Sequence, residues 1–141
     1  MIRYLASVPL LIYLQGCAAD RPPVRPPLDI NRAAFEQQML QRTLPAPPDA
    51  HLDAPLRLTH VSVPDYPMDL MRAGVQGTVA FRFCIEPDGS IRDVEIERSP
   101  HQKLSTLIRY TVGTWKFQPP LRDGVPVRVC DLRMQHVFRL E

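Results

Sequence analysis

The strictest pattern in this chain is an alternation of apolar and polar side chains over residues 78–86. Period two is typical of a β-strand with one buried face, so the segment predicts such a strand. The apolar side chains that share the predicted buried face are Val79, Phe81, Phe83 and Ile85. Residues 87–90 read Pro-Asp-Gly-Ser, and Asp-Gly tolerates the positive φ angles of a tight hairpin turn. A second strand over residues 91–99 should therefore return antiparallel, burying Val94 and Ile96, and its exposed charges suit a sheet edge.

Two helices are predicted around this hairpin. A proline at the start and a glycine at the stop indicate a short helix over residues 67–74. A longer amphipathic helix should follow the hairpin and cover the sheet, with Ser99 as its N-cap, Pro100 at its first position and residues 118–120 ending it. The apolar side chains at helical spacing are Leu104, Leu107, Ile108, Val112 and Trp115.

A last strand is predicted from Val125 onward. Its apolar residues change parity near Asp131, which predicts a β-bulge or a break there. The predicted fold class is therefore α+β: a small two-layer domain over residues 61–141, with a short helix, a β-hairpin, an amphipathic helix and a final strand. We expect a three-stranded antiparallel sheet. A domain of roughly this size buries only a modest core, so a covalent cross-link would help it.

Two cysteines fit that need. Cys84 and Cys130 lie on the strand faces opposite to the apolar residues, so both sulfurs are predicted on the same exposed face. If the first and last strands pair antiparallel, directly opposed Cα atoms are ~4.5 to 5.5 Å apart, a span that a disulfide accepts. Two free buried thiols are the alternative. A metal site is disfavoured, because no CxxC pair or run of histidines accompanies the cysteines.

The first 16 residues have the layout of a secretory signal peptide, with Arg3, then an uncharged apolar run, then a small residue before Cys17. The run is shorter than the ~20 residues that a membrane-spanning helix needs. Residues 14–17, Leu-Gln-Gly-Cys, resemble the lipobox of bacterial lipoproteins, in which the cysteine becomes the acylated first residue. The resemblance implies a lipid anchor on Cys17, and Ala18 implies the outer rather than the inner membrane. An ordinary signal peptide with an incidental cysteine is the alternative.

Residues 17–60 are predicted to form a periplasmic tether. Ten of the 16 prolines lie within residues 20–67, and such stretches favour extended, semi-rigid polyproline II spacers. Within the tether, residues 29–42 predict a helix of about three turns, capped by Asp29 or Asn31. An isolated helix this short is marginal in water, so it should order only against a partner or the domain.

No residue pattern supports catalysis, a metal or a cofactor. The four histidines show no HxH or HExxH spacing, and no GxSxG elbow, P-loop or GxGxxG occurs. We therefore expect a non-enzyme. The formal net charge of +2 is too small and too scattered for a nucleic-acid footprint, so nucleic acid is an unexpected partner.

An ordered set of motifs resembles the TonB C-terminal domain family over about residues 61–141. The motifs are Tyr66-Pro67, the segment from Gly77 to Ser99 with its Pro-Asp-Gly turn, Trp115-Lys116-Phe117-Gln118-Pro119, and Asp123-Gly124-Val125-Pro126-Val127. The resemblance implies a periplasmic domain whose last strand pairs with the TonB box, a short extended segment of outer-membrane transporters, and so transmits energy for uptake. Such binding is β-augmentation, in which main-chain hydrogen bonds on an open edge supply affinity.

The family resemblance also implies where a partner would bind. The implied contact residues are Asp65, Tyr66, Pro67 and Arg72, together with Val129 and Leu132 in the last strand. Two departures from TonB proper are present. No histidine precedes Cys17, whereas TonB carries one in its uncleaved membrane helix, and Val63 stands where TonB has a glutamine three residues before the tyrosine.

Three functions remain open on these grounds. The first is a lipid-anchored module that binds an outer-membrane TonB-dependent transporter by strand addition. The second is a structural or assembly lipoprotein of the Gram-negative cell envelope that uses the same fold to bind another envelope protein. The third is full energy transduction with the signal as an uncleaved anchor. Open strand edges also allow a homodimer.

Overall fold

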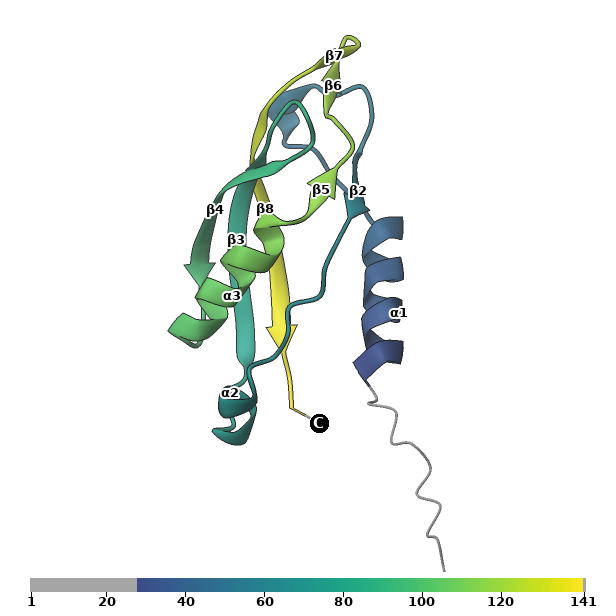
Figure 1. Cartoon of the computed structure of the whole chain (residues 1–141). Helices are drawn as coiled ribbons and strands as arrows, with labels where there is room; N and C mark the ends of the chain where they lie inside the picture. Colours follow the sequence, from purple (N-terminus) through teal and green to yellow (C-terminus); the bar gives the residue numbers. More distant parts are fainter. Residues whose placement is uncertain (1–27, 141) are drawn as a thin grey trace, which may run out of the picture.

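The computed structural model describes residues 28–140 of the chain, with side chains from residue 32 onward (Figure 1). The predicted signal peptide, Cys17 and the first part of the tether lie outside these residues. The elements, in chain order, are α1 (Leu28–Gln41), β1 (Thr43–Leu44), the 3-10 helix η1 (Pro48–Ala50), β2 (Leu56–His60), α2 (Met68–Arg72), β3 (Gly77–Ile85), β4 (Ile91–Arg98), α3 (Gln102–Gly113), β5 (Lys116–Phe117), β6 (Leu121–Arg122), β7 (Val125–Pro126) and β8 (Val129–Phe138). Within this part of the chain, no helix combines the length and the apolar character needed to cross a membrane.

The main sheet is antiparallel and has three strands in the order β4-β3-β8. In β3, Phe81 lies opposite Ile96 of β4 on one side and opposite Met134 of β8 on the other. Helix α3 crosses one face of the sheet, and β4 is an edge strand (Figure 1). The predicted α+β class and the three-stranded antiparallel sheet are therefore confirmed.

The core lies between this sheet and α3. The four side chains predicted for the inner face of β3 are at most 1% exposed, and Leu104, Ile108 and Val112 of α3 are fully buried against them. Each fully buried side chain of this size contributes about 1.5–3 kcal/mol relative to an exposed one. The apolar face of β3, encoded by period two, thus packs against the apolar face of α3, encoded by helical spacing, in one layer.

The start of α3 differs from the prediction. The N-cap is His101, not Ser99, because His101 has an extended backbone and its Nδ1 accepts the N–H of Lys103 at 3.1 Å. Pro100 therefore lies before the helix rather than at its first position. The Ser99 hydroxyl donates instead to the His101 carbonyl at 2.9 Å, which fixes the turn that leads into the helix.

The parity change in the last strand is a β-bulge at Asp131. Phe83 of β3 pairs with Leu132 of β8, whereas Ile85, two residues on, pairs with Val129, three residues back along β8. Asp131 takes a positive φ of 58° to accommodate the extra residue. Beyond the bulge, the inward-facing residues of β8 have the opposite parity, as the sequence predicted.

The bulge brings the two cysteines together. Cys84 and Cys130 form a disulfide across β3 and β8, with their Cα atoms 4.0 Å apart. The bridge is less open to solvent than expected, since Cys84 is only 9% exposed and Cys130 is half-buried. The side chains of Arg82 and Arg128 line the same hollow on the outer face of the sheet as Cys84.

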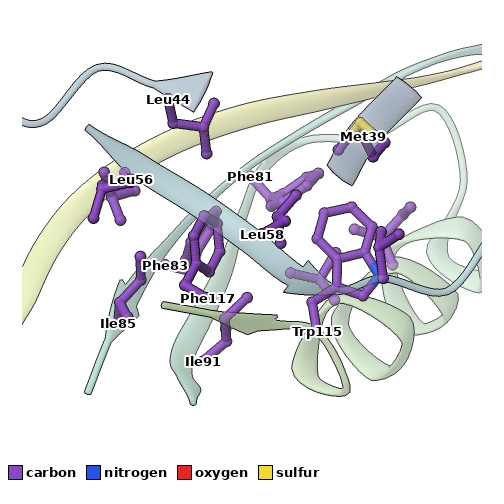
Figure 2. Packing of buried hydrophobic residues seen from close by; sticks show 14 of the residues in the cluster. Met39, Leu44, Leu56, Leu58, Phe81, Phe83, Ile85, Ile91, Trp115 and Phe117 are labelled. Carbon is purple, nitrogen blue, oxygen red and sulfur yellow. The ribbon is translucent and has the colours of Figure 1, made fainter. Parts of the chain in front are cut away.

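The described part of the predicted tether, residues 28–60, is folded onto the domain. A second, small antiparallel sheet has the order β1-β2-β5 and joins residues 43–60 to the segment after α3. Met39, Leu44, Leu56 and Leu58 are all buried in the common core. Figure 2 shows Leu58 and Phe117 of the small sheet beside Phe81 and Phe83 of β3. Residues 28–60 thus form part of the folded body rather than a free spacer.

Two further contacts tie the small sheet to the rest. The carbonyl of Gly89, in the β3–β4 turn, accepts the N–H of Phe117 at 2.9 Å.

At the tip formed by β6 and β7, the Asp53 carboxylate accepts the N–H groups of Gly124 and Asp123, each at 2.9 Å, and these bonds lower the pKa of Asp53. Arg122 donates twice to the Ala50 carbonyl, at 2.8 and 2.6 Å. We call these bonds of Asp53 and Arg122 the tip clamp.

Candidate protein-binding edge

The outer edge of β8 is a free edge of the main sheet within the described residues. Strand β8 pairs with β3 alone, and within residues 28–140 no backbone hydrogen bond joins its other edge to another element. In an antiparallel strand, every second residue turns its N–H and C=O away from its partner. The outer edge of β8 therefore offers a row of unpaired donors and acceptors, which is the template that an added strand needs.

Helix α1 lies beside this edge and leaves a hollow of about 290 Å³ between itself and β8. Phe35, Gln38, Met39 and Arg42 of α1 form one wall, and residues 134–137 of β8 form the other. The floor reaches the core at Phe81, Ile108 and Trp115. The hollow is thus an opening into the apolar core at the place where β8 lacks a neighbour.

His136 connects the two walls of the hollow. Its ring packs edge-on against Phe35 of α1, with centroids 5.7 Å apart, and against Phe138 of β8 at 4.7 Å. Burial between these aromatic rings lowers the pKa of His136, because the imidazolium form is poorly solvated there. Among residues 32–41 of α1, the contacts to the rest of the fold include Phe35, the buried Met39 and an ion pair of Arg32 with Asp65 at 3.4 Å.

Four of the partner-contact residues that the family resemblance implied lie near the C-terminal end of β8. Tyr66 donates its hydroxyl to the Val75 carbonyl and packs edge-on against Phe138 with ring centroids 5.1 Å apart. Pro67 is the N-cap of α2, and Arg72 is exposed in the last turn of that helix. Asp65 is exposed and pairs with Arg32 of α1.

Val129 and Leu132 lie elsewhere. They are near the N-terminal end of β8, and their side chains are only 3% and 4% exposed because both point into the core. A partner could meet these two residues through their main chain alone. The structure therefore does not bring the six implied residues together into one surface.

The hollow was missed by the sequence reasoning. Phe35 and Met39 stand four residues apart on the predicted helix, which is the spacing of one helix face. That spacing was the available signal for a helix docked against the domain. The alternation of Met134 and His136 beyond the bulge was the corresponding signal in the strand.

The outer face of the main sheet is polar. Its ion pairs join Arg82 to Glu95, Arg128 to Glu86 and Asp93, and Arg133 to Glu97. Most of these side chains are well exposed, and such pairs each contribute only about 0–1 kcal/mol. Over residues 32–140, no three His, Cys, Asp or Glu side chains are grouped so that they could hold a metal ion. The edge of β8 and its hollow are therefore the strongest candidate site.

Comparison with known proteins agrees with this architecture. A family model described as Gram-negative bacterial TonB protein C-terminal matches residues 62–140. The protein TonB of Pseudomonas aeruginosa is 27% identical over 73 residues, which are 51% of this chain and 21% of that protein. The protein TonB of Vibrio cholerae is 29% identical over 77 residues, 54% of this chain and 32% of that protein. The matched region thus spans a third or less of the length of either relative.

A solved structure gives the same result. The solution NMR structure of the Pseudomonas aeruginosa TonB CTD superposes with a TM-score of 0.54 at 25% identity, covering 61% of this chain and 87% of that one. The family model alone spans more than half of the chain, and it includes β3, β4, α3 and β8. The chain therefore belongs to the Gram-negative bacterial TonB protein C-terminal family.

Proposed function

We propose that this chain is a non-enzymatic protein-binding module of the Gram-negative cell envelope that holds an extended segment of an outer-membrane transporter against β8. The observation that carries the proposal is the unpaired outer edge of β8 in a domain of the TonB family. An added strand would lie about 4.8 Å from β8 and would use the hydrogen-bonding groups that face away from β3.

The main chain alone supports only weak binding. Residues 44–49 lie beside the start of β8, around Asp131–Arg133, and the stretch over 134–137 borders the hollow. Roughly four main-chain hydrogen bonds at about 1 kcal/mol each correspond to a Kd no tighter than about 1 mM, because association also costs translational and rotational freedom. Affinity above that level must come from side chains of the added segment.

We propose further that Cys17 is acylated and anchors the chain, with the outer membrane favoured by Ala18. Several acyl chains give stable anchoring, since each buried CH₂ contributes about 0.8 kcal/mol. The Cys84–Cys130 disulfide supports export, because such bonds persist in oxidising compartments. Mass spectrometry of the Cys17 peptide tests this part, and an unmodified peptide that still carries residues 1–16 would contradict it.

The experiment that tests strand addition is a titration of the full chain, ¹⁵N-labelled and held in detergent micelles. The probes are synthetic peptides that copy the periplasm-facing N-terminal segments of outer-membrane transporters from the same cell. We expect amide shifts at residues 133–138 of β8 and small shifts on β4. A second set of peptides carries a single N-methyl group on each amide in turn.

N-methylation separates main-chain pairing from side-chain docking. If the peptide adds as a strand, methylation should weaken binding at least about fivefold at every second position and have little effect at the positions between. A uniform response along the peptide would contradict strand addition. No amide shift at millimolar peptide would reject the transporter segment as the partner.

A further inference from the structure

The hollow between α1 and β8 has the properties of a side-chain pocket. Its floor is apolar, and its walls combine the apolar Phe35, Met39 and Met134 with polar side chains such as Gln38 and Gln135. Its volume of about 290 Å³ lies just below the ~300–1,000 Å³ range of small-molecule pockets. A hollow of this size suits one large side chain better than a separate ligand.

The position of the hollow fixes how such a side chain would arrive. Met134 and His136 point to the core-facing side of β8, and both line the hollow. In an added antiparallel strand, a residue directly opposite one of them has its Cβ about 4.5–5.5 Å away on the same side. Every second side chain of the added strand would therefore be directed toward the hollow.

Charge at the rim favours a carboxylate next to that side chain. A second hollow, on the outer side of β8, shares Arg42, Met134, Gln135 and Val137 with the first, so the free edge of the strand separates the two. Arg42 borders both hollows, and none of the ion pairs within residues 32–140 includes it. Glu97 and Arg133 also line the outer hollow, but they pair with each other at 3.1 Å. The residues adjacent to the inward side chain would face the outer hollow, beside this guanidinium.

We propose that α1 and β8 together form a selector that favours extended segments carrying one large apolar side chain with a carboxylate beside it. The inference rests on the proposed strand addition and adds to it that α1, which precedes the region matched by the family model, supplies half of the recognition surface. Phe35 and Met39 of α1 contact the apolar side chain, and Arg42 contacts the carboxylate.

The test uses the oxidised full chain in detergent and a series of dye-labelled nine-residue peptides of threonine, a good strand former. The central residue is Gly, Ala, Leu or Phe, and the next residue is Asp, Ser or Lys. Binding is measured by fluorescence anisotropy. We expect the Leu and Phe peptides to bind about 10- to 100-fold more tightly than the Gly peptide, and Asp to improve binding about two- to fivefold over Ser.

Variants locate the effect on α1. Phe35→Ala removes part of one wall, and Gln38→Trp places an indole toward the hollow, so each should abolish most of the preference for Leu and Phe. Arg42→Glu should reverse the order of the Asp and Lys peptides. Arg92→Glu is the matched control, because Arg92 is an exposed arginine on β4, the opposite edge of the sheet.

The outcomes separate the selector from strand addition itself. If all peptides bind equally, or if the α1 variants behave like Arg92→Glu, the selector is wrong while strand addition stands. If neither these peptides nor the transporter peptides bind at millimolar concentration, both proposals are wrong. If the chain sediments as a dimer that excludes peptide from β8, a second copy occupies the edge and the selector is also rejected.

Discussion

Gly89 joins the two sheets, and its substitution by alanine should be unusually costly. The residue has φ +88°, a left-handed conformation that costs an L-amino acid about 1–2 kcal/mol. An added Cβ would also lie 2.1 Å from the carbonyl oxygen of Phe117. That oxygen belongs to the main chain, so the clash cannot be relieved by a side-chain rotation, and β5 must move.

The movement of β5 has a calculable effect. It breaks the hydrogen bond from the Phe117 N–H to the Gly89 carbonyl, which contributes about 1 kcal/mol. It also disturbs the Phe117 side chain, which is 2% exposed and packs 5.8 Å from the Phe83 ring. Full burial of such a side chain contributes about 1.5–3 kcal/mol. We therefore expect Gly89→Ala to lower the free energy of unfolding by about 3–5 kcal/mol.

Gly124→Ala is the matched control. Gly124 has a similar φ of +76°, but nothing lies within 4 Å of an added Cβ, so only the backbone cost of about 1–2 kcal/mol applies. Urea denaturation of both variants with the disulfide intact measures the difference. With m values of about 1–3 kcal/mol/M, the midpoint of Gly89→Ala should lie about 1–2 M below that of Gly124→Ala. Equal midpoints would refute the close approach of the β3–β4 turn to β5.

Three further predictions concern the bridge, the histidine and the tyrosine. Replacing both Cys84 and Cys130 by serine opens a loop with a sequence separation of 46 residues. In the chain-entropy model this change should lower the free energy of unfolding by about 4 kcal/mol, measured as a lower urea midpoint. An unchanged midpoint would contradict the bridge. His136 is held neutral by burial, so its folded pKa lies below its ordinary value of 6.5. The unfolded chain then binds the proton first as the pH falls, and stability should decline as the pH drops below about 6.5 toward the folded pKa. His136→Gln should flatten that decline in thermal melts between pH 7 and 5, and an equally steep decline in the variant would show that another group titrates. Tyr66→Phe removes the donor to the Val75 carbonyl and should cost about 1 kcal/mol in thermal or urea unfolding, whereas no loss would mean that water replaces the bond.

Local patterns predicted most of the main sheet, but its last strand begins at Val129 and not at Val125, where β7 pairs with β6 instead. The inward side chains of β3, the Asp-Gly turn and the bulge at Asp131 all follow from period two and from one change of parity. These features are encoded by neighbouring residues, so the sequence is sufficient to find them. The N-cap of α3 was wrong because a histidine ring nitrogen took a role that serine fills more often.

The second sheet and the hollow were harder to predict because they depend on distant contacts. Strand β2 follows Pro55 in a proline-rich stretch, and composition favoured a spacer although Leu56 and Leu58 already alternate with polar residues. Its partner β5 is only two residues long, too short to show a period. The hollow forms between α1 and β8, which come from opposite ends of the described chain. No local sequence pattern indicates how far apart these two elements lie in the fold.

The tip clamp has a mechanical consequence for a chain that is pulled from its N-terminal side. The first turn of α1 and the last residues of β8 lie at one end of the molecule, and the β6–β7 tip lies at the other (Figure 1). Tension between residue 28 and a segment held on β8 would peel α1 away turn by turn, while the β8 ladder is loaded in shear along its whole length. Residues 28–49, drawn straight at ~3.4 Å each, span roughly 75 Å. The domain therefore contains a segment that would unfold and lengthen under such tension. The bonds of Ala50 and Asp53 to the β6–β7 tip would stop this lengthening, and beyond that point the disulfide-linked sheet would carry the force.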